Sequence, residues 1–215
     1  MKANIYVLLI VFIIGFIAAL FQTEAWAIYV LIPCGLYVAY SFFYMIILVI
    51  KSYKKKMIFN IKKGKHSTWS LPVFTLKKNI SGTFKFIEGF KYQIKKQKDS
   101  NKLIGLSDGL HHHYNSVRIG WRYNILHPDM IEMVGIIYNN GKRSIFGITY
   151  VDPTKENSFS IEIIKGYYKI QINKTVVSAI RTSNWNFFRY RLNPYFGGDS
   201  PSPNNFSVNI SLIFK

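Results

Sequence analysis

The sequence predicts a two-helix transmembrane hairpin followed by an all-β antiparallel sandwich of the jelly-roll or lectin-like type. Three observations lead to this fold class: the first fifty residues are almost free of charge, the next twenty are rich in lysine, and apolar and polar residues alternate from residue 71 onward. Strict alternation is typical of strands with one buried and one exposed face. We therefore divide the 215 residues into a transmembrane helical hairpin (1–50), a basic juxtamembrane linker (51–69) and a β-sandwich domain (70–215).

The hairpin is predicted from two apolar runs. Residues 5–21 and 25–50 contain no charged side chain, and only Gln22, Thr23 and Glu24 separate them. A membrane-spanning helix needs about 20 apolar residues, and a chain in lipid has to satisfy its own backbone hydrogen bonds. Each run therefore predicts one spanning helix. A cleaved signal peptide is the alternative for the first run, but a second span follows it at once, which favours the hairpin.

The lysines that follow the hairpin predict its orientation. Residues 51–98 hold fourteen lysines and one acid, out of a formal net charge of +18. Positive residues beside a span stay on the cytoplasmic side, so both termini are expected there, or on the inner side of a virion membrane. The residues expected to contact anionic lipid headgroups are Lys54, Lys55, Lys56, Lys62 and Lys63. The alternative partner for these lysines is the phosphate backbone of a nucleic acid, with Tyr53, Phe59 and Trp69 stacking on bases.

The β domain is predicted from alternation and turn residues. Residues 116–123, 158–163 and 206–212 alternate apolar with polar side chains. Asn140-Gly141 indicates a tight hairpin, because this dipeptide suits the positive φ angles of a type I′ turn. Turn signals recur about every 8–12 residues, which favours a sandwich of about ten short strands. Val117, Ile119 and Trp121 are expected in its core.

Three motifs in order resemble an uncharacterised family of small bacterial and phage-borne β proteins. The segments are "HHHYNSVRIGWRYN", "IYNNGKR" and "YRLNPYFGGDSPSP", followed by a closing alternating strand. Family members carry patterns like GxxxxHHxxSxRxGWR, Y-x-NGKR and PYFGG(N/D)xxAPHD, and the resemblance covers about residues 100–212. It implies a lectin-type or jelly-roll sandwich and no established activity. This chain departs from the last motif: Ser202, Asn204 and Asn205 stand in place of Ala, His and Asp.

The histidines do not predict a metal site. His111, His112 and His113 are adjacent, and in a strand only His111 and His113 would share a face. Zinc sites usually need three or four convergent ligands, and no further Cys or His motif lies nearby. The one cysteine, Cys34, lies in the apolar N-terminal block, so no intrachain disulfide is expected. We predict neither a metal nor a cofactor.

Catalysis is not predicted either. Nucleophilic catalysis requires a Ser or Cys beside a base that an acid orients, and glycoside hydrolysis requires two facing carboxylates. Neither arrangement is evident in the alternating pattern, so the sequence predicts that the chain is not an enzyme.

Arg118 and Arg122 are the candidate ligand or partner residues. They share the polar face of one predicted strand, opposite Trp121, and two arginines on an open face can bind carboxylate, phosphate or sugar. The alternative is that they form ion pairs with acids such as Glu132 or Glu162. His111 and His113 are expected at the rim of the same face. A loop forms the second candidate site, with Tyr195, Gly197, Gly198 and Asp199.

Two functions remain open at this stage. The first is a membrane-anchored, non-catalytic structural or interaction subunit that presents the sandwich at a membrane surface to protein partners, a second copy of the chain among them. A minor membrane protein of a lipid-containing virion is one version of it. The alternative is a carbohydrate- or ligand-binding β-sandwich module.

Overall fold

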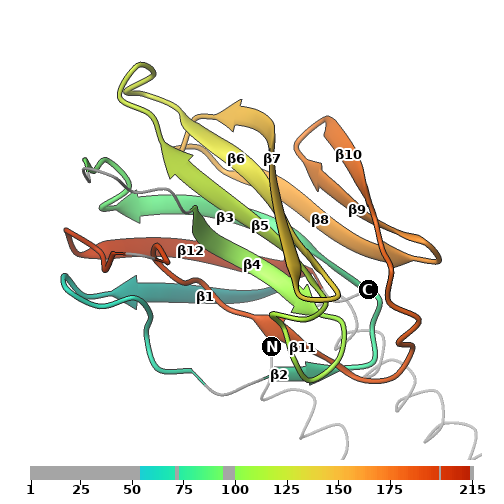
Figure 1. The fold of residues 1–215 in the computed structure, drawn as a ribbon. Helices are drawn as coiled ribbons and strands as arrows, with labels where there is room; N and C mark the ends of the chain where they lie inside the picture. Colours follow the sequence, from blue (N-terminus) through green and yellow to red (C-terminus); the bar gives the residue numbers. More distant parts are fainter. Residues whose placement is uncertain (1–53, 71–72, 94–99, 199, 214–215) are drawn as a thin grey trace, which may run out of the picture. The chain divides into compact units, whose positions relative to one another are not determined.

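The computed structural model describes residues 54–70, 73–93, 100–198 and 200–213 (Figure 1). They belong to one of the two units of the chain, Lys54–Lys215. The predicted hairpin, residues 1–50, lies outside the described residues. Within the described ranges, the structure contains no helix with the length and apolar character that crossing a membrane requires.

The described residues form twelve strands in two six-stranded sheets, and every strand pair is antiparallel. In sheet A the order is β1 (Lys54–Ile61), β12 (Phe206–Ile213), β3 (Asn79–Glu88), β8 (Asn157–Ile164), β9 (Tyr167–Ile172) and β10 (Thr175–Ile180). In sheet B it is β2 (Val73–Thr75), β11 (Arg189–Leu192), β4 (Asn101–Ser107), β5 (Ser116–Tyr123), β6 (Ile131–Asn139) and β7 (Lys142–Val151). The predicted antiparallel, jelly-roll-like sandwich is confirmed, and β2 and β11 lie at one edge of sheet B (Figure 1).

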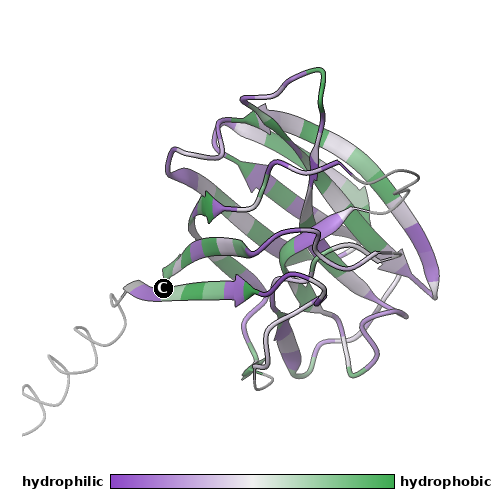
Figure 2. Ribbon diagram, turned by 90° about the vertical axis from the view of Figure 1, so that its left-hand side faces the viewer, coloured by the Kyte–Doolittle hydropathy of each residue, from purple (hydrophilic) through white to green (hydrophobic). Residues whose placement is uncertain are grey.

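Two sequence features explain these elements. Apolar and polar residues alternate along the strands, and glycine or asparagine occupies the turns between them. Hydrophobic and hydrophilic residues alternate along the strands in Figure 2. The predicted hairpin between β6 and β7 turns at Asn140 and Gly141, with φ angles of 50° and 79°. Asn173, between β9 and β10, has a φ of 51°. Gly and Asn tolerate this left-handed region better than other residues, which is why they occupy these turns.

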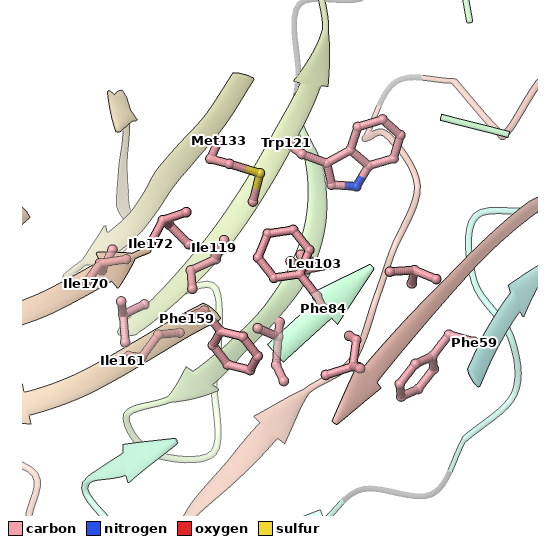
Figure 3. Packing of buried hydrophobic residues seen from close by; sticks show 14 of the residues in the cluster. Phe59, Phe84, Leu103, Ile119, Trp121, Met133, Phe159, Ile161, Ile170 and Ile172 are labelled. Carbon is pink, nitrogen blue, oxygen red and sulfur yellow. The ribbon is translucent and has the colours of Figure 1, made fainter. Parts of the chain in front are cut away.

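The core lies between the two sheets (Figure 3). Trp121 from β5 is 1% exposed. Its ring stacks on Phe206 of β12 with centroids 5.2 Å apart and meets the ring of Phe86 of β3 edge-on at 5.0 Å. The predicted core positions Val117, Ile119 and Trp121 are confirmed. Burial of aliphatic and aromatic side chains from both sheets is the main force that holds the layers together.

One predicted boundary is wrong, because the linker assigned to residues 51–69 contains strand β1. Met57, Phe59 and Ile61 alternate toward the core and pair with Ile210, Val208 and Phe206 of β12. The alternation is short and lysines flank it. The segment therefore resembled a basic linker beside a membrane more than a strand. The side chains of Lys55, Lys56, Lys62 and Lys63 are exposed.

A buried ion cluster fastens one end of sheet B. Asp108 follows β4 and is 3% exposed. Its Oδ2 accepts a hydrogen bond from Nε of Arg181 at 2.6 Å and from the Tyr168 hydroxyl at 3.2 Å. Its Oδ1 lies 3.3 Å from Nη2 of Arg189. Both arginines also donate to the backbone carbonyl of Trp185, at 2.6 and 2.9 Å. The cluster therefore joins the end of β4 to the segment that connects β10 with β11.

Trp121→Ala should destabilise the protein by about 3–5 kcal/mol, because it removes a fully buried ring and leaves a cavity between the sheets. Phe187→Ala is the matched control, since Phe187 is 69% exposed, and it should leave stability within about 0.5 kcal/mol. Denaturant unfolding of the full chain measures both values. Equal losses in the two variants would contradict the packing described here.

Asp108→Asn should cost about 3–5 kcal/mol, because it leaves two buried guanidinium groups without their shared counter-charge. The matched control is Asp129→Asn. That carboxylate lies 3.3 Å from Nζ of Lys91, but its side chain is 90% exposed, so its loss should change stability by less than about 1 kcal/mol. The same unfolding measurement applies. A loss for Asp108→Asn no larger than that for the control would show that the cluster does not stabilise the fold.

Candidate functional site

The turn between β4 and β5 carries the three histidines. Asp108 begins this turn, where its backbone N–H donates to the carbonyl of Asn115 at 2.9 Å. Within the turn, the N–H of Tyr114 donates to the carbonyl of His111, also at 2.9 Å. The Ser116 hydroxyl donates to the carbonyl of His112 at 2.6 Å. These bonds hold His112 close to the face of sheet B that is turned away from the core.

A groove of about 420 Å³ opens beside this turn. It lies over the edge of sheet B that contains β4, β11 and the segment before β2. Its lining residues are Ser67, Thr68, Trp69, Ser70, His112, Arg118, Tyr190, Arg191, Leu192, Asn193, Pro194 and Tyr195. Its volume falls in the range of about 300–1,000 Å³ that is typical of small-ligand sites. Among the described residues that line it, none is acidic.

Arg118 is one of the residues that line the groove. It lies on β5 opposite Gly105 of β4. A Cβ at position 105 would lie 2.5 Å from the carbonyl oxygen of Val117 and 2.7 Å from Cγ of Arg118. Only glycine leaves room for the arginine stem to cross β4 at this point. Arg118 is 7% exposed as a residue, so its charge lies in surroundings where electrostatic interactions are stronger than in bulk water.

His112 and Tyr190 form a hydrogen-bonded pair beside Arg118. Nδ1 of His112 lies 2.5 Å from the Tyr190 hydroxyl oxygen. Tyr190 is brought there by pairing of β11 with β4, where it lies opposite Ser107. Burial, followed by the positive charge of Arg118, lowers the pKa of His112 from 6.5 to about 4. The imidazole is therefore neutral at pH 7, with one nitrogen able to accept a proton.

Aromatic rings form the walls of the groove. Trp69 is 85% exposed and Tyr195 is 36% exposed. Tyr195 stacks on the ring of His66, with centroids 5.2 Å apart and 15° between the planes. Backbone hydrogen bonds of 2.8 and 3.0 Å join Tyr195 to Lys102 of β4. Tyr195 is consequently fastened to the sheet, whereas Trp69 lies exposed in the segment before β2.

The two predicted arginines have different surroundings. Arg122 forms an ion pair with Glu132 across β5 and β6, with Nε and Oε2 3.4 Å apart. This is the ion pairing that the sequence analysis gave as the alternative to ligand binding. Arg118 instead lines the groove. Both lie on the face of β5 opposite Trp121, as the alternation predicted.

His111 and His113, expected at the rim of the Arg118 face, lie in the turn that precedes β5. Residues 111–115 form a turn, so strand parity does not apply there. His111 and His113 are exposed, and His112 is the histidine that lines the groove. The hydrogen bonds of the turn fix this choice, and they link residues three to seven positions apart.

The predicted loop contributes one residue to the groove, Tyr195. Gly197 has a φ of 62°, and its backbone N–H donates to Oδ1 of Asn101 at 2.6 Å while its carbonyl accepts from Nζ of Lys102 at 2.9 Å. It therefore holds the loop to β4. Gly198 is exposed, and Asp199 lies outside the described residues.

Sequence reasoning missed His112, Tyr190 and Trp69 as groove residues. Trp69 was assigned to the lysine stretch, and Tyr190 lies in a four-residue strand with arginines on either side. The one available signal was a tryptophan beside serine and threonine, directly before the β domain. The lysines proposed to contact phosphates do not line this groove. In the described ranges, no three His, Cys, Asp or Glu side chains gather as metal ligands would.

Comparison with known proteins identifies the fold. No protein-family model matches the chain, and no curated protein matches its sequence. Among solved structures, alginate lyase AlyC3 aligns with a TM-score of 0.52 and 13% identity over 74% of each chain. A functionally unknown protein from Saccharomyces cerevisiae aligns with a TM-score of 0.45 and 11% identity over 76% of this chain and 93% of its own. A family 16 glycoside hydrolase endo-glucanase from Bacteroides ovatus aligns with a TM-score of 0.43 and 13% identity, over 74% and 79% of the two chains.

The expectation that the chain is not an enzyme is corrected by this comparison. The described sandwich shares its fold with alginate lyase AlyC3, so this architecture accommodates a catalytic site. The expectation rested on two kinds of catalytic site, a nucleophile with its base and a pair of facing carboxylates. It overlooked the His112–Tyr190 pair, because residues 78 positions apart become neighbours only in the folded sheet.

The pKa of His112 predicts a pH-dependent loss of stability. Its folded-state value of about 4 lies below the unfolded value of 6.5, so the unfolded chain binds more protons between these two values. The contribution of His112 to the free energy of unfolding should be complete above pH 6.5 and decline as the pH falls toward 4. His112→Gln should show a shallower decline over this window in denaturant unfolding of the full chain. Equal slopes in the two proteins would contradict the assigned pKa.

Proposed function

We propose that the sandwich domain binds an acidic saccharide in the groove beside the β4–β5 turn. The observation that carries this proposal is that Arg118 lines a groove together with the exposed aromatic side chains of Trp69 and Tyr195. This is the carbohydrate- or ligand-binding alternative of the sequence analysis. The fold shared with alginate lyase AlyC3 supports it, because that sandwich accommodates a polysaccharide.

The chemistry of the lining suits a sugar. The exposed ring of Trp69 offers a face on which the apolar C–H surface of a pyranose can pack. Tyr195, whose ring stacks on His66, adds a polar hydroxyl at the edge of its ring. Ser67, Thr68 and Asn193 line the same groove with hydroxyl and amide groups that can bond sugar hydroxyls. A few polar groups among apolar walls are typical of sites that orient a small ligand.

The charge of the groove favours an acidic sugar over a neutral one. Arg118 and Arg191 both line it, and no described lining residue is acidic. A guanidinium group presents planar N–H donors that match a carboxylate in two-point hydrogen bonding. The formal net charge of +18 further attracts polyanions to the protein surface.

The other function expected from the sequence was a membrane-anchored interaction subunit. It rested on residues 1–50, which lie outside the described residues, and on the lysines of residues 54–63, which do not line the groove. Attachment to a bilayer, contact with protein partners and the cytoplasmic or virion-interior side therefore stay predictions. They are compatible with saccharide binding, since an anchor and a binding groove occupy different parts of the chain.

Arg118→Gln should weaken binding of acidic oligosaccharides by about 10- to 100-fold, because charge-assisted hydrogen bonds contribute about 1.5–3 kcal/mol. Isothermal titration calorimetry on the full chain measures the affinity. The probes are oligomannuronate, oligoguluronate, oligogalacturonate and hyaluronan fragments, with a neutral cello-oligosaccharide of similar length for comparison. The acidic fragments should bind more tightly than the neutral one.

Arg122→Gln is the charge-matched control, because Arg122 lies on the same strand and pairs with Glu132. It should change the affinity by less than about threefold, as expected for a half-exposed ion pair outside the groove. Equal losses in the two arginine variants would point to a general effect of charge rather than a site at Arg118. Failure of all four acidic fragments to bind would overturn the proposed function.

A further inference from the structure

The pair formed by His112 and Tyr190 goes beyond what binding requires. A binding groove needs hydrogen-bond donors and a counter-charge, which Arg118 and the serine and threonine hydroxyls already supply. The pair adds a neutral imidazole that is hydrogen-bonded to a phenol, at the same end of the groove as a guanidinium group. A base, an acid and a fixed positive charge around one cavity are the components of proton transfer at a carbon next to a carboxylate.

Other cleavage chemistries lack their components among the described lining residues. Hydrolysis of a glycosidic bond generally uses two carboxylates that flank it, and no described residue of the groove carries one. A covalent route needs a hydroxyl or thiol activated by a base. Among the described residues that line the groove, no hydrogen bond joins the hydroxyl of Ser67, Thr68 or Ser70 to His112. Elimination requires neither a carboxylate pair nor a nucleophile.

We propose that the groove cleaves the acidic saccharide by β-elimination, with His112 as the base, Tyr190 as the acid and Arg118 as the carboxylate-binding group. This inference rests on the proposed function, since elimination requires the saccharide to bind. The substrate class is a polysaccharide of uronates. In these sugars the ring carbon C5 carries the carboxylate and a hydrogen, and the neighbouring C4 carries the glycosidic oxygen.

The step balances without water, oxidant or metal. Arg118 binds the carboxylate and stabilises the negative charge that develops on it as the C5–H bond breaks. Nε2 of His112 takes the proton, and the electron pair forms a double bond between C4 and C5. The C4–O bond breaks, and the oxygen leaves with its electrons on the adjoining sugar, where it takes the phenolic proton of Tyr190. One product ends in an unsaturated uronate and the other in a new reducing end.

The hydrogen bond between His112 and Tyr190 provides a route by which both side chains return to their starting protonation states. Nδ1 of His112 carries the hydrogen in the tautomer that leaves Nε2 free, so it donates to the Tyr190 oxygen. After the step the imidazole is a cation and the phenol is an anion. Transfer of the Nδ1 proton to the phenolate makes both neutral again, and exchange with water restores the starting tautomer. The low pKa of His112 favours this return to the neutral imidazole.

The experiment combines binding and product analysis on the full chain. The four acidic oligosaccharides named above are incubated with the protein, and those that bind are followed by the ultraviolet absorbance of the unsaturated uronate and by mass spectrometry. Elimination yields products whose masses sum to that of the substrate. We expect at least one of the bound fragments to give unsaturated product.

Variants then test the assigned roles. His112→Gln and Tyr190→Phe should each lower the turnover rate by about 10²-fold or more, the usual contribution of a general base or acid, while calorimetry shows affinity within about threefold of the wild type. Tyr190→Phe keeps the ring that packs edge-on against Phe74. His111→Gln is the matched control, since His111 is exposed and does not line the groove, and it should leave the rate unchanged.

The outcomes separate the two proposals. Binding without unsaturated product from any bound fragment would overturn elimination and leave saccharide binding intact. Products that together gain the mass of one water would show hydrolysis and also overturn it. Full turnover in either His112→Gln or Tyr190→Phe would overturn the role assigned to that residue. Absence of binding by all four fragments would overturn the proposed function itself.

Discussion

The buried cluster of Asp108, Arg181 and Arg189 is the interaction on which the site depends. Asp108 directly follows strand β4 and begins the turn that carries His112, and Arg189 directly precedes Tyr190 on β11. One carboxylate thus sets the positions of two chain segments whose side chains meet in the groove. A buried charge is tolerated only when it is paired and hydrogen-bonded, so these segments cannot separate without leaving charge unpaired inside the protein.

Glycine and backbone pairing complete the same region. Gly105 leaves room for Arg118 to cross β4, and the isolated bridge between Lys102 and Tyr195 fixes the aromatic wall. Arg118 and Tyr190 therefore come from strands and His112 from a hydrogen-bonded turn, whereas the lining residues of 67–70 lie outside the strands. A site on rigid elements holds its side chains within the narrow limits that recognition or proton transfer requires.

The two faces of sheet B contribute to different parts of the protein, one to the core and the other to the groove. The inner face of β5 contributes Val117, Ile119 and Trp121 to the core, and its outer face contributes Arg118 to the groove. Because side chains of a strand alternate between faces, the outer residues can change without disturbing the core. This separation explains how one sandwich accommodates different sites, and why fold similarity at 13% identity identifies the architecture and not the reaction.

The sequence by itself determined the sandwich, its core strand β5 and the hairpin at Asn140-Gly141, because alternation and turn chemistry are local properties of the chain. It also placed Arg118 on the face opposite Trp121. Tertiary structure alone decided that His112, rather than His111 or His113, joins Tyr190 and Arg118. That choice depends on contacts between β4, β5 and β11 and on a buried ion cluster whose members are 73 and 81 residues apart in sequence. No local sequence pattern predicts these contacts, since they form only once β4 has paired with both β5 and β11.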